Sequence, residues 1–314
     1  MNTVHLFFAC DDGYVPFLSV ALASIVKHHD PQRTYAVRVL HTGLSEESRC
    51  RLREVLSVPG FTLEFPDISR HIREFASQLH TRDYYSCSTY YRLFIPELYP
   101  ELSKALYLDS DLVLRQDVAK LYDVELGDAL VGAVPDAVVS AVEEFRLYVQ
   151  NRLDIEQPED YFNAGVLLMN LDAMRRCDFS HHFLQLLEAV TFRVGQDQDY
   201  LNVLCRHRVR YLGNEWNTMP TGASVSSPSL IHYNLDAKPW QKDGVKYEED
   251  FWHCAALSGF LPELKAIRAA RTVQQQEKAA TQTRELIRTG YNQAMDREEN
   301  ARIHRRIRQV VSRL

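Results

Sequence analysis

Glycine is scarce in this chain of 314 residues: it occurs 12 times, and neither G-x-G-x-x-G nor G-x-x-x-x-G-K-[ST] is present. This excludes a glycine loop that cradles a phosphate, so a phosphate ligand would need a metal and cationic side chains to neutralise it. Long apolar runs are also missing, since stretches such as Ala164–Met169 fall far below the roughly 18 residues that span a bilayer. The sequence therefore predicts no transmembrane helix.

The six cysteines form no C-x-x-C pair, which is typical of neither a zinc ribbon nor a disulfide framework. Residues 1–5 have no Lys or Arg and no small-residue cleavage site, so no signal peptide is expected. The expected location is therefore the cytoplasm, where thiols stay reduced.

Positive charge is sparse outside the C-terminal segment. Residues 1–261 carry 24 Lys and Arg against 36 Asp and Glu, whereas residues 262–314 carry 12 against 6. Nucleic-acid binding depends on clustered Lys and Arg, so the acidic body argues against a nucleic-acid partner.

Apolar runs alternate with helical patterns through the first 66 residues, and this alternation predicts an α/β fold with an at least partly parallel sheet. The expected strands and helices follow the order Val4–Cys10, Phe17–His28, Tyr35–Leu40, Ser45–Leu56 and Phe61–Phe65. Further helices are expected at Ile68–Leu79, Thr89–Leu98 and around Phe183–Val190, with strands at 105–108, 130–134, 165–169, 209–212 and 230–233. Ser45, followed by two glutamates, is expected to cap a helix.

Two carboxylates, Asp109 and Asp111, come directly after the apolar run Leu106–Leu108. Ligands of open α/β sheets gather beyond the carboxyl ends of strands, so this pair is placed to hold a divalent cation through oxygen atoms. A solvated turn after a buried strand is the alternative interpretation of such a pair.

A second segment with suitable chemistry is His232–Trp240, at the end of an expected strand. The imidazole of His232 would add a nitrogen ligand to an oxygen-rich site, which suits Mn²⁺ better than Mg²⁺ or Ca²⁺. Lys238 could reach the same phosphates as a point charge. A hydrogen-bonded histidine at a strand end is the structural alternative.

Together, six motifs resemble family 8 glycosyltransferases, which include bacterial lipopolysaccharide glucosyl- and galactosyltransferases. They occur in the family's order over roughly residues 3–255: Cys10–Tyr14, Tyr91–Leu93, Tyr107–Asp111, Phe162–Leu168, Asp197–Asn202 and His232–Trp240. The resemblance implies a GT-A fold, a Rossmann-like mixed sheet flanked by helices. It also implies Mn²⁺-dependent transfer of a hexose from a UDP-sugar with retention of configuration, with Mg²⁺ as a substitute metal.

By matched position, the resemblance implies that Asp109, Asp111 and His232 bind the metal and that Lys238 supports the diphosphate. Asp11 and Tyr14 match residues that hold uracil. Asp12 lies in the same loop and is either a further donor-binding residue or a helix cap.

The resemblance further implies that Arg92, Asp136, Asn163 and Asp197 orient the hydroxyls of the donor sugar. Gln198 matches the residue that faces the anomeric carbon opposite the leaving group. Because an amide is a poor nucleophile, we favour attack from the face of departure, with Gln198 giving electrostatic support. Asp197 and Asp199 leave a carboxylate nucleophile open.

The chain departs from the family pattern at Leu235, where many members have a glycine that lets the backbone approach a phosphate. Gly13 likewise stands where a polar uridine contact is common.

The expected division is a GT-A domain at residues 1–260 and a basic helical extension at 261–314. In its last turns Ile303, Ile307, Val310, Val311 and Leu314 share one face among arginines, which predicts a basic amphipathic helix. Two roles are open for it: peripheral attachment to the inner membrane face, or packing on the body or on a second copy of the chain.

Two other functions compete with transfer of a hexose to a glycan or lipid-linked acceptor. Leu106–Val113 also fits the strand of haloacid-dehalogenase-type phosphatases, in which Asp109 would be the nucleophile. A non-catalytic protein that binds sugar nucleotides is the second alternative. The sequence does not distinguish glucose from galactose as the donor sugar.

Overall fold

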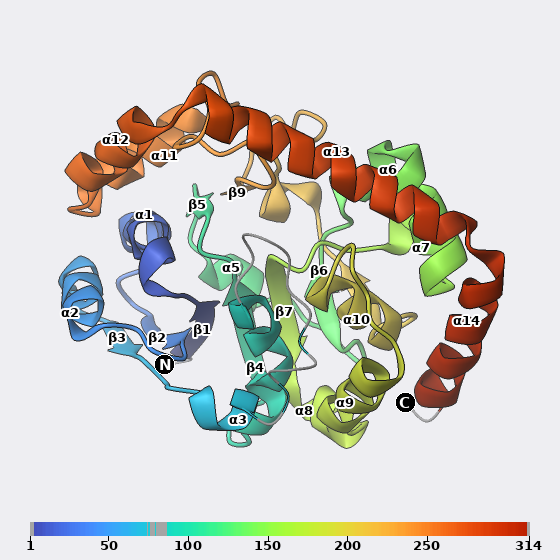
Figure 1. Cartoon of the computed structure of the whole chain (residues 1–314). Helices are drawn as coiled ribbons and strands as arrows, with labels where there is room; N and C mark the ends of the chain where they lie inside the picture. Colours follow the sequence, from blue (N-terminus) through green and yellow to red (C-terminus); the bar gives the residue numbers. More distant parts are fainter. Residues whose placement is uncertain (1–2, 74, 76–78, 80–86, 313–314) are drawn as a thin grey trace. The chain divides into compact units, whose positions relative to one another are not determined.

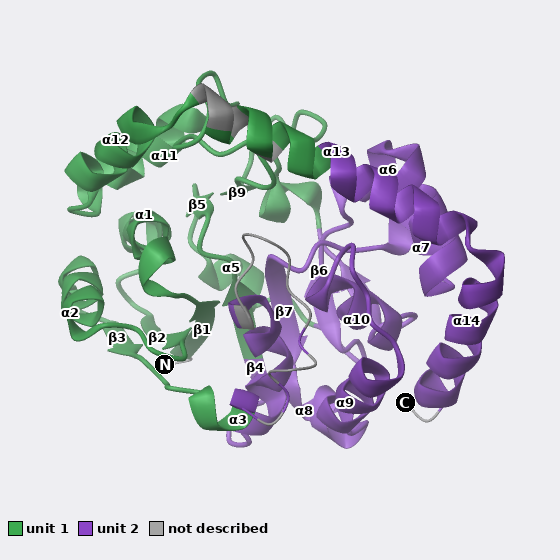
Figure 2. Cartoon of the chain, in the orientation of Figure 1, with its two compact units in different colours: residues 1–71, 105–125, 213–283 green, residues 72–104, 126–212, 284–314 purple. Residues whose placement is uncertain are grey.

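The computed structural model describes residues 3–73, 75, 79 and 87–312. They divide into two compact units, each of which combines segments far apart in the sequence (Figure 2). Unit 1 comprises residues 1–71, 105–125 and 213–283, and unit 2 comprises residues 72–104, 126–212 and 284–314. The expected division into a GT-A domain and a C-terminal extension at residue 260 stays a prediction.

Unit 1 is built on parallel strands in the order β3-β2-β1-β4 (Figure 1). Their bounds are β1 Thr3–Ala9, β2 Thr34–Leu40, β3 Phe61–Glu64 and β4 Lys104–Leu108. Val4, Leu6, Phe7 and Phe8 are fully buried, because a parallel sheet is covered on both faces and its strands bury apolar side chains on either side. The expected parallel sheet is thus confirmed.

Helices and a two-stranded ladder complete unit 1. The helices are α1 Val15–His28, α2 Glu46–Val55, α3 Ser69–Arg73, α5 Ala119–Tyr122, α11 Glu248–Leu257 and α12 Leu261–Ala270, and the ladder pairs β5 Leu112–Leu114 with β9 Leu230–His232 in antiparallel sense. The expected cap of α2 is confirmed, since the Ser45 side chain accepts a hydrogen bond from the backbone N–H of Ser48. The helix expected at Ile68–Leu79 is described only as α3, and residues 74 and 76–78 lie outside the described part.

Among the described residues of unit 2, strands form at β6 Val131–Ala133, β7 Val166–Asn170 and β8 Val209–Tyr211. β6 pairs with β7 in antiparallel sense and with β8 in parallel sense, so the predicted mixed α/β fold is confirmed. Its helices are α4 Ile95–Leu98, α6 Ala137–Ala141, α7 Glu143–Leu153, α8 Leu171–Arg176, α9 Phe179–Ala189, α10 Asp197–Leu204 and α14 Arg297–Val311. The helix expected at Thr89–Leu98 is instead a 3₁₀ helix, η2 Cys87–Phe94, followed by α4.

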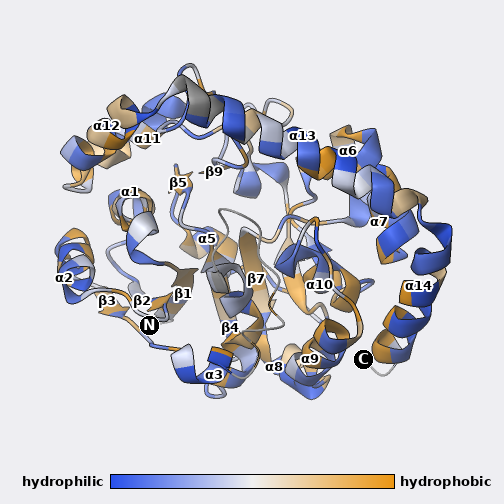
Figure 3. Cartoon of the chain, in the orientation of Figure 1, coloured by the Kyte–Doolittle hydropathy of each residue, from blue (hydrophilic) through white to orange (hydrophobic). Residues whose placement is uncertain are grey.

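The C-terminal segment is helical, as predicted, with α13 at Val273–Met295 followed by α14. α14 packs against α7 and α9 and carries alternating polar and apolar stripes (Figure 3). Ile303, Ile307 and Val310 are buried, whereas Arg313 and Leu314 lie outside the described residues. The apolar face of α14 is therefore covered by unit 2.

Basic side chains of α14 bind the carboxyl ends of the helices beneath it. Arg306 donates to the backbone carbonyl of Ala189, the last residue of α9, with an N–O distance of 2.6 Å. His304 Nε2 lies 2.8 Å from the carbonyl of Asn151 in α7. Cations are favourable at helix carboxyl ends, so this packing accounts for part of the basic charge of the segment. Among the described residues, no helix is both long and apolar enough to cross a membrane.

Candidate active site

Most of the predicted site residues of unit 1 follow β1 and β4, two parallel neighbours in the sheet. The strand order β3-β2-β1-β4 changes direction between them, which makes their carboxyl ends a topological switch point. Asp11 and Tyr14 follow β1, and Asp109 and Asp111 follow β4. The fold therefore brings these side chains to one edge of the sheet, where ligands of such sheets bind.

His232 reaches this edge through the ladder between β5 and β9, in which it pairs with Leu112, the residue after Asp111. Its Nε2 atom lies 3.2 Å from Asp111 Oδ1 and 3.7 Å from Asp109 Oδ2. One ligand atom from each of the three residues lies within 4.8 Å of the others. Two carboxylates and an imidazole fit a divalent cation, and the predicted triad is thus brought together.

Lys238 lies beside the triad and is buried. Its ammonium group donates hydrogen bonds to Asp111 Oδ2 and, at 2.9 Å, to the carbonyl oxygen of Tyr233. Burial alone would raise the pKa of Asp111, but the neighbouring Lys238 ammonium group and His232 imidazole outweigh it and hold this pKa well below its usual range. Asp111 is therefore a carboxylate at neutral pH, with a cation already next to it.

Tyr14 lies within electrostatic reach of the same groups. The positive charge of Lys238 lowers the pKa of the phenol, but burial together with the negative charges of Asp111 and Asp109 outweighs this effect and raises it. The Asp11 side chain accepts a hydrogen bond of 3.2 Å from the backbone N–H of Tyr14. The loop after β1 and the triad are therefore neighbours.

Asp12 points elsewhere, because its carboxylate accepts hydrogen bonds from Ser45 and Ser48 at the start of α2. The Ser45 hydroxyl is 2.8 Å away and the Ser48 hydroxyl 2.6 Å away. The hydrogen bond from Ser48 is the main cause that lowers the pKa of Asp12. Asp12 thus ties the loop to α2, whereas the helix that follows it in the chain receives no cap from it.

In unit 2, Arg92 and Asp197 form a buried ion pair, with 3.1 Å between Arg92 Nε and Asp197 Oδ2. The Thr89 hydroxyl donates to Asp197 Oδ1 at 2.5 Å, and Arg92 also donates to the carbonyl oxygen of Ala164. A 3₁₀ turn, the start of α10 and the segment before β7 are joined here. The sequence predicted Arg92 and Asp197 as residues that orient the donor sugar, but neither their ion pair nor the contact with Thr89.

Asp136, Asn163 and Gln198 form a hydrogen-bonded cluster in the same unit. Asp136 Oδ2 accepts from Asn163 Nδ2 at 3.0 Å and from Gln198 Nε2 at 3.1 Å. The other end of the Gln198 amide, Oε1, accepts from the backbone N–H of Ala164 at 2.9 Å. Both ends of this amide are engaged, so its orientation is fixed by the protein.

Asp199, the second carboxylate considered above as a nucleophile, is fully buried among tyrosines. Its oxygens accept hydrogen bonds of 2.8 Å from the hydroxyls of Tyr148 and Tyr161 and from the backbone N–H of Gly195. These contacts give Asp199 a structural role in holding α10 against α7.

Leu235 adopts a left-handed backbone conformation, with φ of 49°. This conformation is unfavourable for a residue with a Cβ atom and favourable for glycine. The position at which the sequence departs from the family pattern therefore has a glycine-like backbone despite its leucine side chain.

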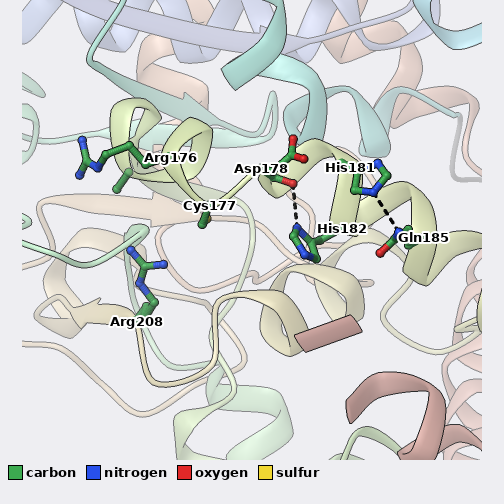
Figure 4. A pocket seen from close by; sticks show the side chains of 8 residues that line it. Arg176, Cys177, Asp178, His181, His182, Gln185 and Arg208 are labelled. Carbon is green, nitrogen blue, oxygen red and sulfur yellow. Dashed lines mark hydrogen bonds between the residues drawn. The ribbon is translucent and has the colours of Figure 1, made fainter. Parts of the chain in front are cut away.

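A separate cavity of about 540 Å³ lies in unit 2 (Figure 4). Arg176, Cys177, His182 and Arg208 are among the residues that line it, and they come from α8, α9 and the turn before β8. β7 separates α8 from Asn163, since Asn163 precedes this strand and α8 follows it. The cavity is therefore distinct from the cluster of Asp136, Asn163 and Gln198.

Residues 5–244 match Glycosyl transferase family 8, and the chain belongs to this family. It is 32% identical to the lipopolysaccharide 1,2-glucosyltransferase of Escherichia coli (strain K12) over 184 residues, which cover 52% of this chain and 53% of that protein. The galactosyltransferase LgtC, solved with donor and acceptor sugar analogues, is 31% identical with a TM-score of 0.67, and the match covers 81% of this chain and 95% of LgtC.

The bifunctional glycosyltransferase WbbM in its apo form is 28% identical with a TM-score of 0.71. The match covers 85% of this chain but 52% of WbbM, so the chain spans about half of that protein. Together these similarities confirm the GT-A fold and the transferase class, and they leave the phosphatase alternative without support.

Proposed function

We propose that the chain is a retaining, metal-dependent hexosyltransferase. It would move glucose or galactose from a UDP-sugar to a glycan or glycoconjugate acceptor in the synthesis of cell-surface polysaccharide or lipopolysaccharide. The observation that carries this proposal is the convergence of Asp109, Asp111 and His232 beside Tyr14 and Lys238 at the switch point of the sheet. The glycosyltransferase family and the sugar ligands named for LgtC support it.

The three convergent residues would hold the metal, and the nitrogen donor of His232 favours Mn²⁺, with Mg²⁺ as a substitute. When bound, a divalent cation supplies Lewis-acid neutralisation of the diphosphate that leaves. Lys238, already directed at Asp111, would turn its ammonium group to the same oxygens. Asp11 and Tyr14 would hold the uracil.

In unit 2, Arg92, Asp136, Asn163 and Asp197 would orient the sugar hydroxyls. Gln198 would stabilise the positive charge that develops at the anomeric carbon. Its Oε1 atom already accepts hydrogen bonds from Ala164 and Asn163, which makes it a weaker nucleophile still. We therefore retain attack from the face of departure: the bond from the anomeric carbon to UDP breaks, the bond to the acceptor oxygen forms, and the acceptor proton passes to the departing phosphate.

Binding of UDP tests this proposal before any acceptor is known. Calorimetry should detect binding of UDP when Mn²⁺ is present and no binding of UDP in EDTA. GDP and ADP should bind more weakly than UDP, because Asp11 and Tyr14 would select uracil. Tight binding of UDP without turnover of any UDP-sugar would favour the non-catalytic alternative. Metal-independent binding of all three diphosphates would contradict the proposed site.

Location, membrane contact and self-association are further parts of the proposed function. We propose a cytoplasmic location, with the acceptor either a soluble glycan or a lipid-linked one at the inner membrane face. Membrane attachment through α14 would require its buried face to leave α7 and α9. Self-association as a homo-oligomer also stays a prediction.

A further inference from the structure

A short 3₁₀ helix, η4 Asn214–Asn217, lies next to the strand that carries His232. The residue after it, Thr218, bridges to Ile231. Its backbone N–H donates to Leu230 at 2.9 Å, and its carbonyl accepts from the backbone N–H of His232, also at 2.9 Å. Because Asn217 directly precedes Thr218, these two hydrogen bonds hold its backbone next to that of His232.

The side chain of Asn217 uses this placement to contact the imidazole. Its Oδ1 atom lies 3.0 Å from His232 Nδ1, and both residues are buried, with exposed fractions of 4% each. An amide oxygen only accepts hydrogen bonds, so Nδ1 must carry the proton of this contact. In the neutral ring the lone pair is then on Nε2, the nitrogen that faces Asp109 and Asp111.

We propose that Asn217 is the positioning residue of the metal site, which selects the His232 tautomer and ring orientation that present Nε2 to the cation. The inference rests on the metal role in the proposed function and deepens it. Loss of the hydrogen bond to the other nitrogen of a metal-binding imidazole typically weakens metal affinity by about 10- to 100-fold. The residue acts through His232.

Two substitutions separate positioning from simple packing. Asn217→Leu keeps the approximate size but removes the acceptor, so the buried Nδ1–H loses its partner and the competing tautomer becomes available. Asn217→Asp keeps an acceptor for Nδ1–H and gives it a charge. Asn214→Leu is the matched control, because Asn214 lies in the same 3₁₀ helix but is exposed.

The first measurement is made on the metal-free protein and needs no activity. Long-range ¹H–¹⁵N correlation spectra of the neutral imidazole, assigned by the signal lost in His232→Gln, should show the proton on Nδ1 in the wild type and in Asn217→Asp. Asn217→Leu should shift the ring towards the Nε2–H tautomer. A wild-type ring protonated on Nε2 would overturn the inference, even if Asn217→Leu fails to fold.

The second measurement is Mn²⁺ affinity from the electron paramagnetic resonance signal of the free ion. The dissociation constant should rise about 10- to 100-fold in Asn217→Leu, should not rise in Asn217→Asp, and should be unchanged in Asn214→Leu. Equal affinities in the wild type and Asn217→Leu would overturn the positioning role. A wild type that binds no Mn²⁺ would instead contradict the proposed function, so the two failures are distinguishable.

Discussion

In unit 1, Asp109, Asp111 and His232 direct their ligand atoms at one point, whereas in unit 2 Asp136, Asn163 and Gln198 direct polar atoms at one another. The first arrangement concentrates negative charge, and the positive charge of Lys238 offsets the repulsion between its two carboxylates. The second holds neutral amides and one carboxylate in a network whose members orient each other.

The contrast indicates a division of labour between the two sets of residues. Concentrated negative charge suits a cation and, through it, a diphosphate. A network of fixed dipoles suits a group of hydroxyls and a charge that develops only during reaction, because dipoles that are already oriented cost no reorganisation at that moment. Substitutions in the two units should therefore fail in different ways.

The largest effect is expected for Asp109→Asn in unit 1. The variant removes one ligand charge without disturbing Lys238, which is bound to Asp111. Mn²⁺-dependent UDP release should fall by about a thousandfold or more, since Lewis-acid neutralisation contributes several kcal/mol. The measurement is turnover together with Mn²⁺ affinity.

Asp123→Asn is its matched control, because Asp123 belongs to an exposed ion pair with Arg33 in the same unit. This variant should retain wild-type turnover. An Asp109→Asn enzyme that is as active as the control would break the assignment of the metal site.

The next largest effect is expected on the free energy of unfolding, for a substitution in unit 2. In Asp197→Ala, the buried guanidinium of Arg92 loses its carboxylate, which for such pairs costs about 3 to 5 kcal/mol in the free energy of unfolding. Glu46→Ala removes the exposed partner of Arg53 and should lower the free energy of unfolding far less, because water already screens this pair. Urea denaturation of both variants checks this difference, and equal losses would contradict a network built on buried contacts.

A smaller effect is expected for Gln198→Glu, which replaces the donor at Asp136 with a carboxylate. Two like charges would then face each other where Nε2 now lies 3.1 Å from Asp136 Oδ2. Turnover should fall by about one to two orders of magnitude, comparable to the loss of one oriented dipole, while Mn²⁺ affinity stays unchanged. A parallel loss of Mn²⁺ affinity would show that the two sets of residues are not separable.

The smallest effect is expected for Leu235→Gly in unit 1. Glycine relieves the left-handed strain but gains freedom in the unfolded chain, so the net stabilisation should be at most about 1 kcal/mol. Ala237→Gly, two residues on, has no positive φ to relieve and should destabilise by roughly 0.5 to 1 kcal/mol. Thermal unfolding of the two variants gives the comparison, and destabilisation by both would show that Leu235 is not strained.

Much of the sheet could be predicted because its strands are local signals. Apolar runs such as Leu6–Phe8 and Val166–Met169 are buried on both faces, and burial of this kind shows in the sequence as uninterrupted hydrophobicity. The cap at Ser45 is equally local. The motif residues of both units were predicted through their resemblance to a family, and the structure groups them within each unit.

What could not be predicted depends on contacts between distant segments. Nothing local in the sequence distinguishes Asn217 from other asparagines, because its partner His232 is brought close only by the backbone bonds of Thr218. The same holds for Asp12, whose partners Ser45 and Ser48 follow another strand. Amphipathicity predicted α14, but the surface that covers it is set by the tertiary packing of α7 and α9.

The central claim is that the residues at the ends of β4 and β9 serve metal-dependent transfer from a UDP-hexose. Acceptor-free hydrolysis of UDP-glucose, UDP-galactose and UDP-N-acetylglucosamine tests it most directly, with Mn²⁺ and with EDTA, beside a generic phosphatase substrate. We expect slow UDP release from glucose or galactose that disappears in EDTA, which would also name the donor. Phosphatase turnover with Mg²⁺ and no release from any UDP-sugar would contradict the account.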